Sequence, residues 1–212
     1  MPTHSEEVFE KFLTANNIVF EKIEETVNQK GARRPDYLVK LPDAKLMFEV
    51  KELNEDPNFG VQNPAHPNIR SHSGTPGNHI RDRINSSKKQ VQFGANQGIP
   101  SVLLVYNNLD PVFQLFGTDE FDFRTAMYGE FTILIDKHSS ESSEMFQGRK
   151  NELQESKNTS FSAVGHICDR GGVATVTLYE NIYSKVQLPF DLLPPCFAVK
   201  RFEVKNDPLT FS

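Results

Sequence analysis

The chain has too few cysteines to be held together by disulfide bonds or by a zinc–thiolate centre. Only Cys168 and Cys196 occur among its 212 residues, and two thiols build neither a disulfide framework nor a four-cysteine zinc site. No apolar run approaches the roughly 18 residues of a membrane span, and the N-terminus lacks the basic-then-apolar layout of a secretory signal. These absences predict a protein of the reducing cytoplasm with no membrane partner.

Two common catalytic signatures are also missing. There is no Gly-x-x-x-x-Gly-Lys-Ser/Thr loop, which argues against a P-loop ATPase, and no Gly-x-Ser-x-Gly turn to present a serine nucleophile. The spacing of His66, His72 and His79 fits no compact zinc pattern. His166 and Cys168 supply only half of a ligand set. Contact with phosphate or simple loop polarity is the better interpretation of the three loop histidines, and a structural role that of His166 and Cys168.

The remaining composition supports a folded core but not a nucleic-acid coat. Seventeen Phe and a hydrophobic share of 37% exclude a wholly disordered chain, and the length suits a single domain, residues 1–212. A net charge of −5 argues against a protein that coats nucleic acid by charge alone.

The charge is unevenly distributed along the chain. Residues 61–100 hold five basic residues against one acid, whereas residues 107–160 hold ten acids against five bases. One interpretation is a localised anion site on an acidic body. The other is an ordinary solvated helix face beside a polar loop.

The apolar pattern predicts an α/β (α+β) protein, a mixed β-sheet flanked by helices. Its first half reads as helix, three strands, helix, strand, at residues 5–15, 18–25, 36–41, 45–51, 79–97 and 101–106. Its second half predicts further strands of the same sheet, a β-rich C-terminal extension, at residues 131–136, 161–167, 173–180 and 197–204. Residues 54–78 and 137–160 are expected to be loops, the first too long for an ordinary connection.

Charged residues interrupt two adjacent apolar strands. Glu49 and Lys51 alternate with Phe48 and Val50, so they share one strand face. A hairpin turning about Asp43 pairs residues whose numbers sum to about 86, which brings Asp36 within one residue of both charges. Two carboxylates and one ammonium would then meet at one place. Such a group suits Mg²⁺ or Mn²⁺, although the bare spacing also arises by chance.

Pro35-Asp36 and Glu49-Val50-Lys51 resemble the two motif halves of the PD-(D/E)XK nuclease superfamily, whose members have the restriction-endonuclease-like fold. The resemblance covers about residues 5–106, with residues 107–212 as the extension. It implies that Asp36 and Glu49 bind a divalent metal and that Lys51 positions or activates the attacking water. It also implies an acid on the first helix, for which Glu6 is the choice and Glu7 and Glu10 are rivals; helix-end charge balance is the alternative role.

The resemblance also implies a polar second helix facing the site. Gln90 or Lys89 would fill that place, while Arg81, Arg83 and Lys88 would contact a nucleic-acid backbone. A solvent-facing amide for Gln90 and a solvated face for the cations are the alternatives.

The expected function is therefore that of a metal-dependent endonuclease hydrolysing phosphodiester bonds, with DNA the preferred substrate and defence against foreign DNA the preferred setting. Asp36, Glu49, Lys51 and Glu6 are the predicted catalytic residues, and cleavage of both strands would need a second copy, a protein partner or two visits. The alternative is a non-catalytic nucleic-acid-binding or protein-assembly module on the same fold.

Overall fold

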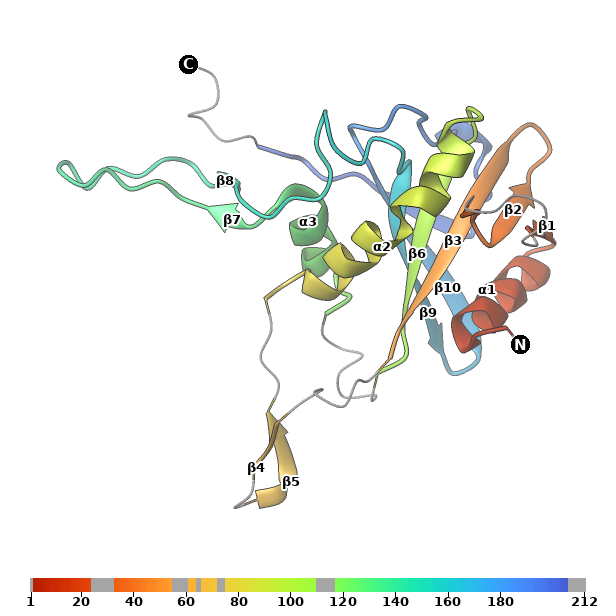
Figure 1. Cartoon of the computed structure of the whole chain (residues 1–212), viewed down its shortest axis with the longest axis horizontal. Coiled ribbons are helices and arrows are strands. Elements are labelled where there is room, and N and C mark those ends of the chain that lie inside the picture. The colour runs from red at the N-terminus through yellow and green to blue at the C-terminus, as the bar shows by residue number, and fades with distance from the viewer. Residues whose placement is uncertain are drawn as a thin grey trace.

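The computed structural model describes residues 2–23, 33–54, 61–63, 66–71, 75–109 and 117–205, with 61–63 and 66–71 described by their backbone alone. Within these ranges the chain forms three α-helices and a large central sheet (Figure 1). No helix of the described residues is long and apolar enough to cross a membrane.

The central sheet is mixed and has seven strands in the order β1-β2-β3-β6-β9-β10-β11. The strands are β1 (Val19–Lys22), β2 (Tyr37–Lys40), β3 (Lys45–Leu53), β6 (Ser101–Asn107), β9 (Ala163–Arg170), β10 (Val173–Glu180) and β11 (Phe197–Lys200). Strands β3, β6 and β9 run parallel to one another, and β10 pairs parallel with β11; the other pairs are antiparallel. All positions of β6 are buried, as expected for a parallel strand covered on both faces.

Helix α1 (His4–Ala15) covers one face of the sheet. Thr3 and Glu6 form a capping box at its start, and its apolar side buries Phe9 against Tyr37 and Phe48, with ring centroids 5.4 Å and 5.1 Å apart. This packing makes one of the two hydrophobic clusters that the described residues form.

Helices α2 (Asn78–Ala95) and α3 (Glu120–Tyr128) cover the opposite face and build the second cluster. Arg81 joins the two helices, because its guanidinium donates to the carbonyls of Pro76 and Lys150 at 2.9 Å and to that of Thr125 at 3.4 Å. Only 6% of Arg81 is exposed.

The mixed sheet flanked by helices is confirmed, and β9, β10 and β11 extend it as expected. Helix α3 was not predicted; its signal is the capping box of Asp119 and Asp122. The expected strand at 131–136 was wrong in extent. Only β7 (Phe131–Thr132) is a strand, paired with β8 (Phe146–Gln147), because the apolar run leaves the sheet and forms an arm that projects from the body (Figure 1).

The predicted loop 54–78 also contains structure. Its described part forms an antiparallel hairpin of β4 (Val61–Asn63) and β5 (His66–Ser71), interrupted by an irregularity between Gln62 and Asn63. That irregularity breaks the two-residue period by which a strand is recognised in a sequence. Residues 55–60, 64–65 and 72–74, with His72, lie outside the described residues.

Candidate functional site

The hairpin of β2 and β3 brings Asp36 directly opposite Glu49. Tyr37 pairs with Phe48 in the register of the two strands, so the preceding and following residues face each other. The Leu41 amide donates to the Ala44 carbonyl at 2.8 Å and closes a two-residue turn. Paired numbers therefore sum to 85 rather than to the expected 86. Asp36 therefore lies opposite Glu49 as expected but two residues from Lys51, so the expectation that it would fall within one residue of both was wrong for Lys51.

Asp36 takes over the hydrogen bonding of the sheet where β2 begins. Its Oδ2 accepts the Val50 amide at 2.7 Å, which is the kind of donor that a ladder carbonyl would otherwise satisfy. Burial raises the pKa of Asp36 above its usual range, while the Val50 amide and the Lys51 cation oppose that rise. The Asp36 carboxylate is thus held firmly beside β3.

Glu49 is a nearly inaccessible carboxylate with 1% of its surface exposed. Its Oε1 lies 2.5 Å from Lys51 Nζ, and its enclosed Oε2 has no N–H or O–H donor among the described residues. The Asp36 carboxyl lies within hydrogen-bonding reach of the Glu49 carboxyl. Burial and the adjacent Asp36 charge raise the pKa of Glu49 to about 7, against the opposing effect of Lys51. An unsatisfied buried carboxylate oxygen is costly and calls for an explanation.

Helix α2 lies over this part of β3. Gly94 of the helix packs on Met47, whereas Ile80 and Ile84 share a cluster with Leu53 at the far end of the strand. The middle of the helix therefore passes over Glu49 and Lys51. Three side chains of this middle part have enclosed polar atoms with no partner among the described residues, and they are Arg83 (Nε), Ser87 (Oγ) and Gln90 (Oε1).

The predicted helix acids are engaged elsewhere. Glu6 Oε2 accepts the Thr3 amide at 2.9 Å in the capping box, although its charge still adds to the raised pKa of Asp36. Glu10 accepts the Tyr37 hydroxyl at 2.7 Å, and Glu7 is exposed. Helix capping, the alternative interpretation of Glu6, describes the arrangement better than a direct place in the site.

The predicted nucleic-acid-binding residues divide into three groups. Arg81 is enclosed and donates to main-chain carbonyls, so its role is structural and we remove it from the set. Lys89 is exposed, and Lys88 is half-buried at the border of the buried face of α2. Arg83 and Gln90 are half-buried, which does not fit the solvent-facing amide that was the alternative for Gln90.

Sequence reasoning missed Arg34 and Ser87. The Arg34 guanidinium carbon lies 5.3 Å from the ring centre of Phe93 on α2, and Ser87 is fully buried on the same helix. Position 87 is four residues after Arg83 and three before Gln90, so helical spacing could have shown that these three residues lie along one side of α2. Nothing in the sequence indicates that Arg34 would reach a helix almost sixty residues later.

The carboxylates suit a hydrated cation better than a closed metal site. No group of three or more His, Cys, Asp or Glu side chains in the described ranges is placed to hold a metal ion. Asp36 and Glu49 together offer two hard oxygen ligands, and one enclosed oxygen of Glu49 has no N–H or O–H donor among the residues described. Mg²⁺ is commonly bound by one or two carboxylates while it keeps several waters. The two residues therefore fit such an ion.

His166 is a half-buried histidine on β9, packed beside an aromatic ring. Its ring lies 5.9 Å from that of Phe123, and burial lowers its pKa to about 4. The structural interpretation of this residue therefore fits its surroundings.

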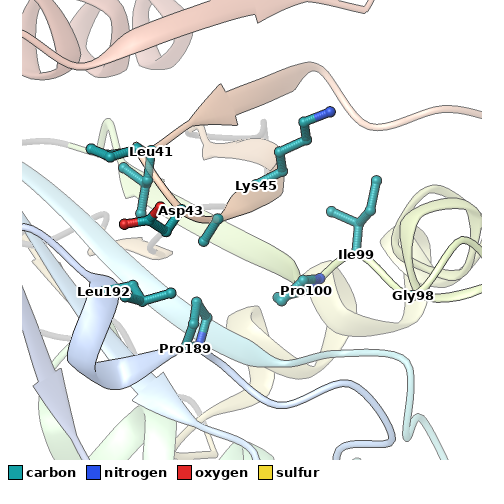
Figure 2. Close-up of a pocket in the computed structure, with 10 residues that line it drawn as sticks. Leu41, Asp43, Lys45, Gly98, Ile99, Pro100, Pro189 and Leu192 are labelled. Atoms are coloured by element: carbon teal, nitrogen blue, oxygen red, sulfur yellow. The ribbon is translucent and has the colours of Figure 1, made fainter.

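A separate hollow of about 520 Å³ lies at the other end of β3. It is lined by the β2–β3 turn, by Ile99 and Pro100, and by Pro189 and Leu192 (Figure 2). Lys45 on its wall is four residues from Glu49, which is about 13 Å along a strand. The hollow is mainly apolar and does not include the carboxylates.

Comparison of the chain with protein-family models, with curated proteins and with solved structures finds no match.

Proposed function

We propose that this protein is a metal-dependent nuclease of the PD-(D/E)XK type, acting in the cytoplasm with DNA as its preferred substrate. The observation that carries the proposal is the pair Asp36 and Glu49, held opposite each other and partly neutralised by Lys51. Buried acids with raised pKa values beside a cation are characteristic of functional sites.

The energetic cost of this arrangement supports a functional role. A buried charge is tolerated when it is paired and hydrogen-bonded, but the Glu49 carboxylate has one oxygen without an N–H or O–H donor among the described residues. Three polar atoms of α2 are enclosed in the same unsatisfied state. A purely structural core would gain stability from apolar side chains at these positions, so a bound ion and substrate give the polar groups a purpose.

The order of elements agrees with the resemblance of the sequence. Helix α1, strands β1, β2 and β3, helix α2 and strand β6 follow one another as the restriction-endonuclease-like core would require. The chain departs from that pattern in the β4–β5 hairpin and in the capping role of Glu6. These departures put Glu6 in doubt but leave the two motif halves intact.

Each residue has a specific proposed task. Asp36 and Glu49 would hold Mg²⁺ or Mn²⁺, and the ion when bound would supply positive charge to the phosphate under attack. Lys51 pairs with Glu49 and would orient the attacking water and stabilise the negative charge that develops on the phosphoryl oxygens. Gln90 on α2 is half-buried and would contact the substrate through its side-chain amide, whereas Ser87 is fully buried and would not touch it.

The direct test is cleavage of supercoiled plasmid, linear duplex, single-stranded DNA and RNA with Mg²⁺, Mn²⁺ or EDTA. We expect metal-dependent cutting that falls at least 100-fold in Asp36→Asn, Glu49→Gln and Lys51→Ala. Lys45→Ala is the matched control, an exposed lysine on the same strand, and should cut as the unaltered protein does.

The alternative is a binding or assembly module without catalysis. Metal-independent binding of nucleic acid with no turnover of any substrate in any ion would favour it. Cutting that survives Asp36→Asn or Lys51→Ala would remove the assignment of the site.

A further inference from the structure

Arg34 bridges the strand that carries Asp36 and the helix that covers Glu49. It precedes Pro35, and a residue before proline is restricted to extended backbone, so Arg34 lies about 7 Å along the chain from Asp36. Its side chain reaches α2, where the guanidinium carbon is 5.3 Å from the Phe93 ring centre. The residue therefore lies between the start of β2 and helix α2, two positions from Asp36.

The contact with Phe93 orients the Arg34 guanidinium. A cation over an aromatic face is attracted by the ring quadrupole, and a held guanidinium loses less freedom when it binds a further group. Both partners are half-buried. The planar fork of a guanidinium matches phosphate oxygens in a two-point contact.

Arg83 provides a second cation on the same helix. Positions 83 and 93 are about 15 Å apart along a helix axis, and Ser87 and Gln90 lie between them. The Nε of Arg83 is enclosed and without a hydrogen-bond partner among the described residues. Two guanidiniums thus flank the part of α2 that passes over Glu49.

We propose that Arg34 and Arg83 bind backbone phosphates on either side of the scissile one, so that a nucleic-acid strand runs beside α2 and past the half-buried Asp36, with Glu49 beneath the helix. The inference rests on the proposed nuclease function. A separation of about 15 Å spans several phosphates at about 3.4 Å of axial rise per phosphate on each strand. The two cations also offset the repulsion between acidic side chains and the substrate, which an overall charge of −5 would otherwise strengthen.

The test is binding of a fluorescein-labelled DNA duplex and of a labelled single strand in EDTA, measured by anisotropy over a range of NaCl concentrations. We expect Arg34→Ala and Arg83→Ala each to weaken binding about 5- to 10-fold and to reduce the salt slope by about one phosphate contact. Arg34→Lys keeps the charge but not the planar fork and should bind with intermediate affinity. Arg149→Ala removes an exposed arginine elsewhere and should bind normally.

Phe93→Leu tests the orientation of Arg34 without changing the charge. It should weaken binding less than Arg34→Ala does and should leave the salt slope unchanged. Circular dichroism and thermal unfolding will show that each variant is folded. In cleavage assays the Arg34 and Arg83 variants should raise KM and leave kcat within about threefold.

The outcomes separate this inference from the proposed function. Binding that depends on Arg34 and Arg83 in a protein that never cuts would support the phosphate contacts and contradict the nuclease. Cutting by a protein whose binding is unaffected by both substitutions would support the nuclease and overturn the contacts. Failure of the unaltered chain to bind or cut any nucleic acid would overturn both.

Discussion

At the scale of single residues, two glutamates three positions apart on β3 have opposite effects on stability. Glu49 is buried beside Asp36, and its pKa is raised to about 7. Glu52 accepts the Ser5 amide at 2.8 Å and the Asn108 amide at 2.9 Å. Burial alone would raise the pKa of Glu52, but these hydrogen bonds lower it below the usual value. One carboxylate is therefore costly in its charged form, while the other is stabilising.

Glu49→Gln should stabilise the metal-free protein increasingly as the pH rises. A raised pKa means that the unfolded state ionises first, so the stability conferred by protonated Glu49 is complete below about pH 4.5 and lost as the pH passes 7. The variant lacks this loss, which is at most roughly 3 kcal/mol. Urea unfolding in EDTA at pH 4.5, 6 and 8 measures the difference, and a pH-independent difference would contradict it.

Glu52→Gln is the matched substitution of opposite sign. Its lowered pKa stabilises the protein above the usual glutamate pKa, and the effect is lost as the pH falls through the lower folded value. We expect the variant to be about 1–2 kcal/mol less stable at pH 7, because it weakens a charge-assisted hydrogen bond to a helix amide. The deficit should shrink at pH 3.5 in the same urea titrations.

At the scale of elements, the position of α2 over the site depends on its contact with α3. The amide of Gly77, the N-cap residue of α2, donates to Asp122 Oδ1 at 2.7 Å. A residue of the neighbouring helix thus accepts the hydrogen bond of a backbone amide that has no partner within α2. A Cβ on Gly77 would lie 2.7 Å from the Asp122 carbonyl oxygen and 2.8 Å from the Ala126 nitrogen. The two helices are thus too close for any side chain at this position.

Gly77→Ala should destabilise the protein by about 1–3 kcal/mol more than Gly98→Ala does. Both glycines have left-handed backbone, with φ of +74° and +71°, so both variants bear the same conformational penalty of about 1 kcal/mol. No heavy atom of the described residues lies within 4 Å of a Cβ on Gly98. Chemical denaturation gives the two free energies of unfolding, and equal losses would show that the α2–α3 contact is not tight.

At the scale of the whole molecule, the stability resides in the sheet and its covering helices rather than in the projecting arm. No residue between 133 and 145 is buried, and Ile133, Ile135 and Met145 are 49%, 71% and 50% exposed. The base of the arm is closed by the pairing of Thr132 with Phe146. The arm therefore adds little to either hydrophobic cluster.

Replacing residues 133–145 by Asn-Gly, a two-residue hairpin turn, should change the free energy of unfolding by less than about 1 kcal/mol. The replacement removes the ion pair of Glu144 with Lys205, both of which are largely exposed and contribute little. Thermal and urea unfolding of the shortened chain provide the measurement. A loss of several kcal/mol would show that the arm supports the body.

The sequence by itself determined the mixed sheet, most of its strands and the meeting of Asp36 with Glu49, because apolar periodicity and a short hairpin act over a few residues. It did not locate α3. It also did not locate the arm, since the apolar pattern of a short run is the same whether the run joins the central sheet or leaves it. Only the tertiary structure decided that Arg81 is structural and that Arg34 reaches Phe93. These two roles depend on contacts between residues far apart in the chain, for which local sequence carries no signal, whereas the capping box of Thr3 and Glu6 is a local pattern that the sequence already contains.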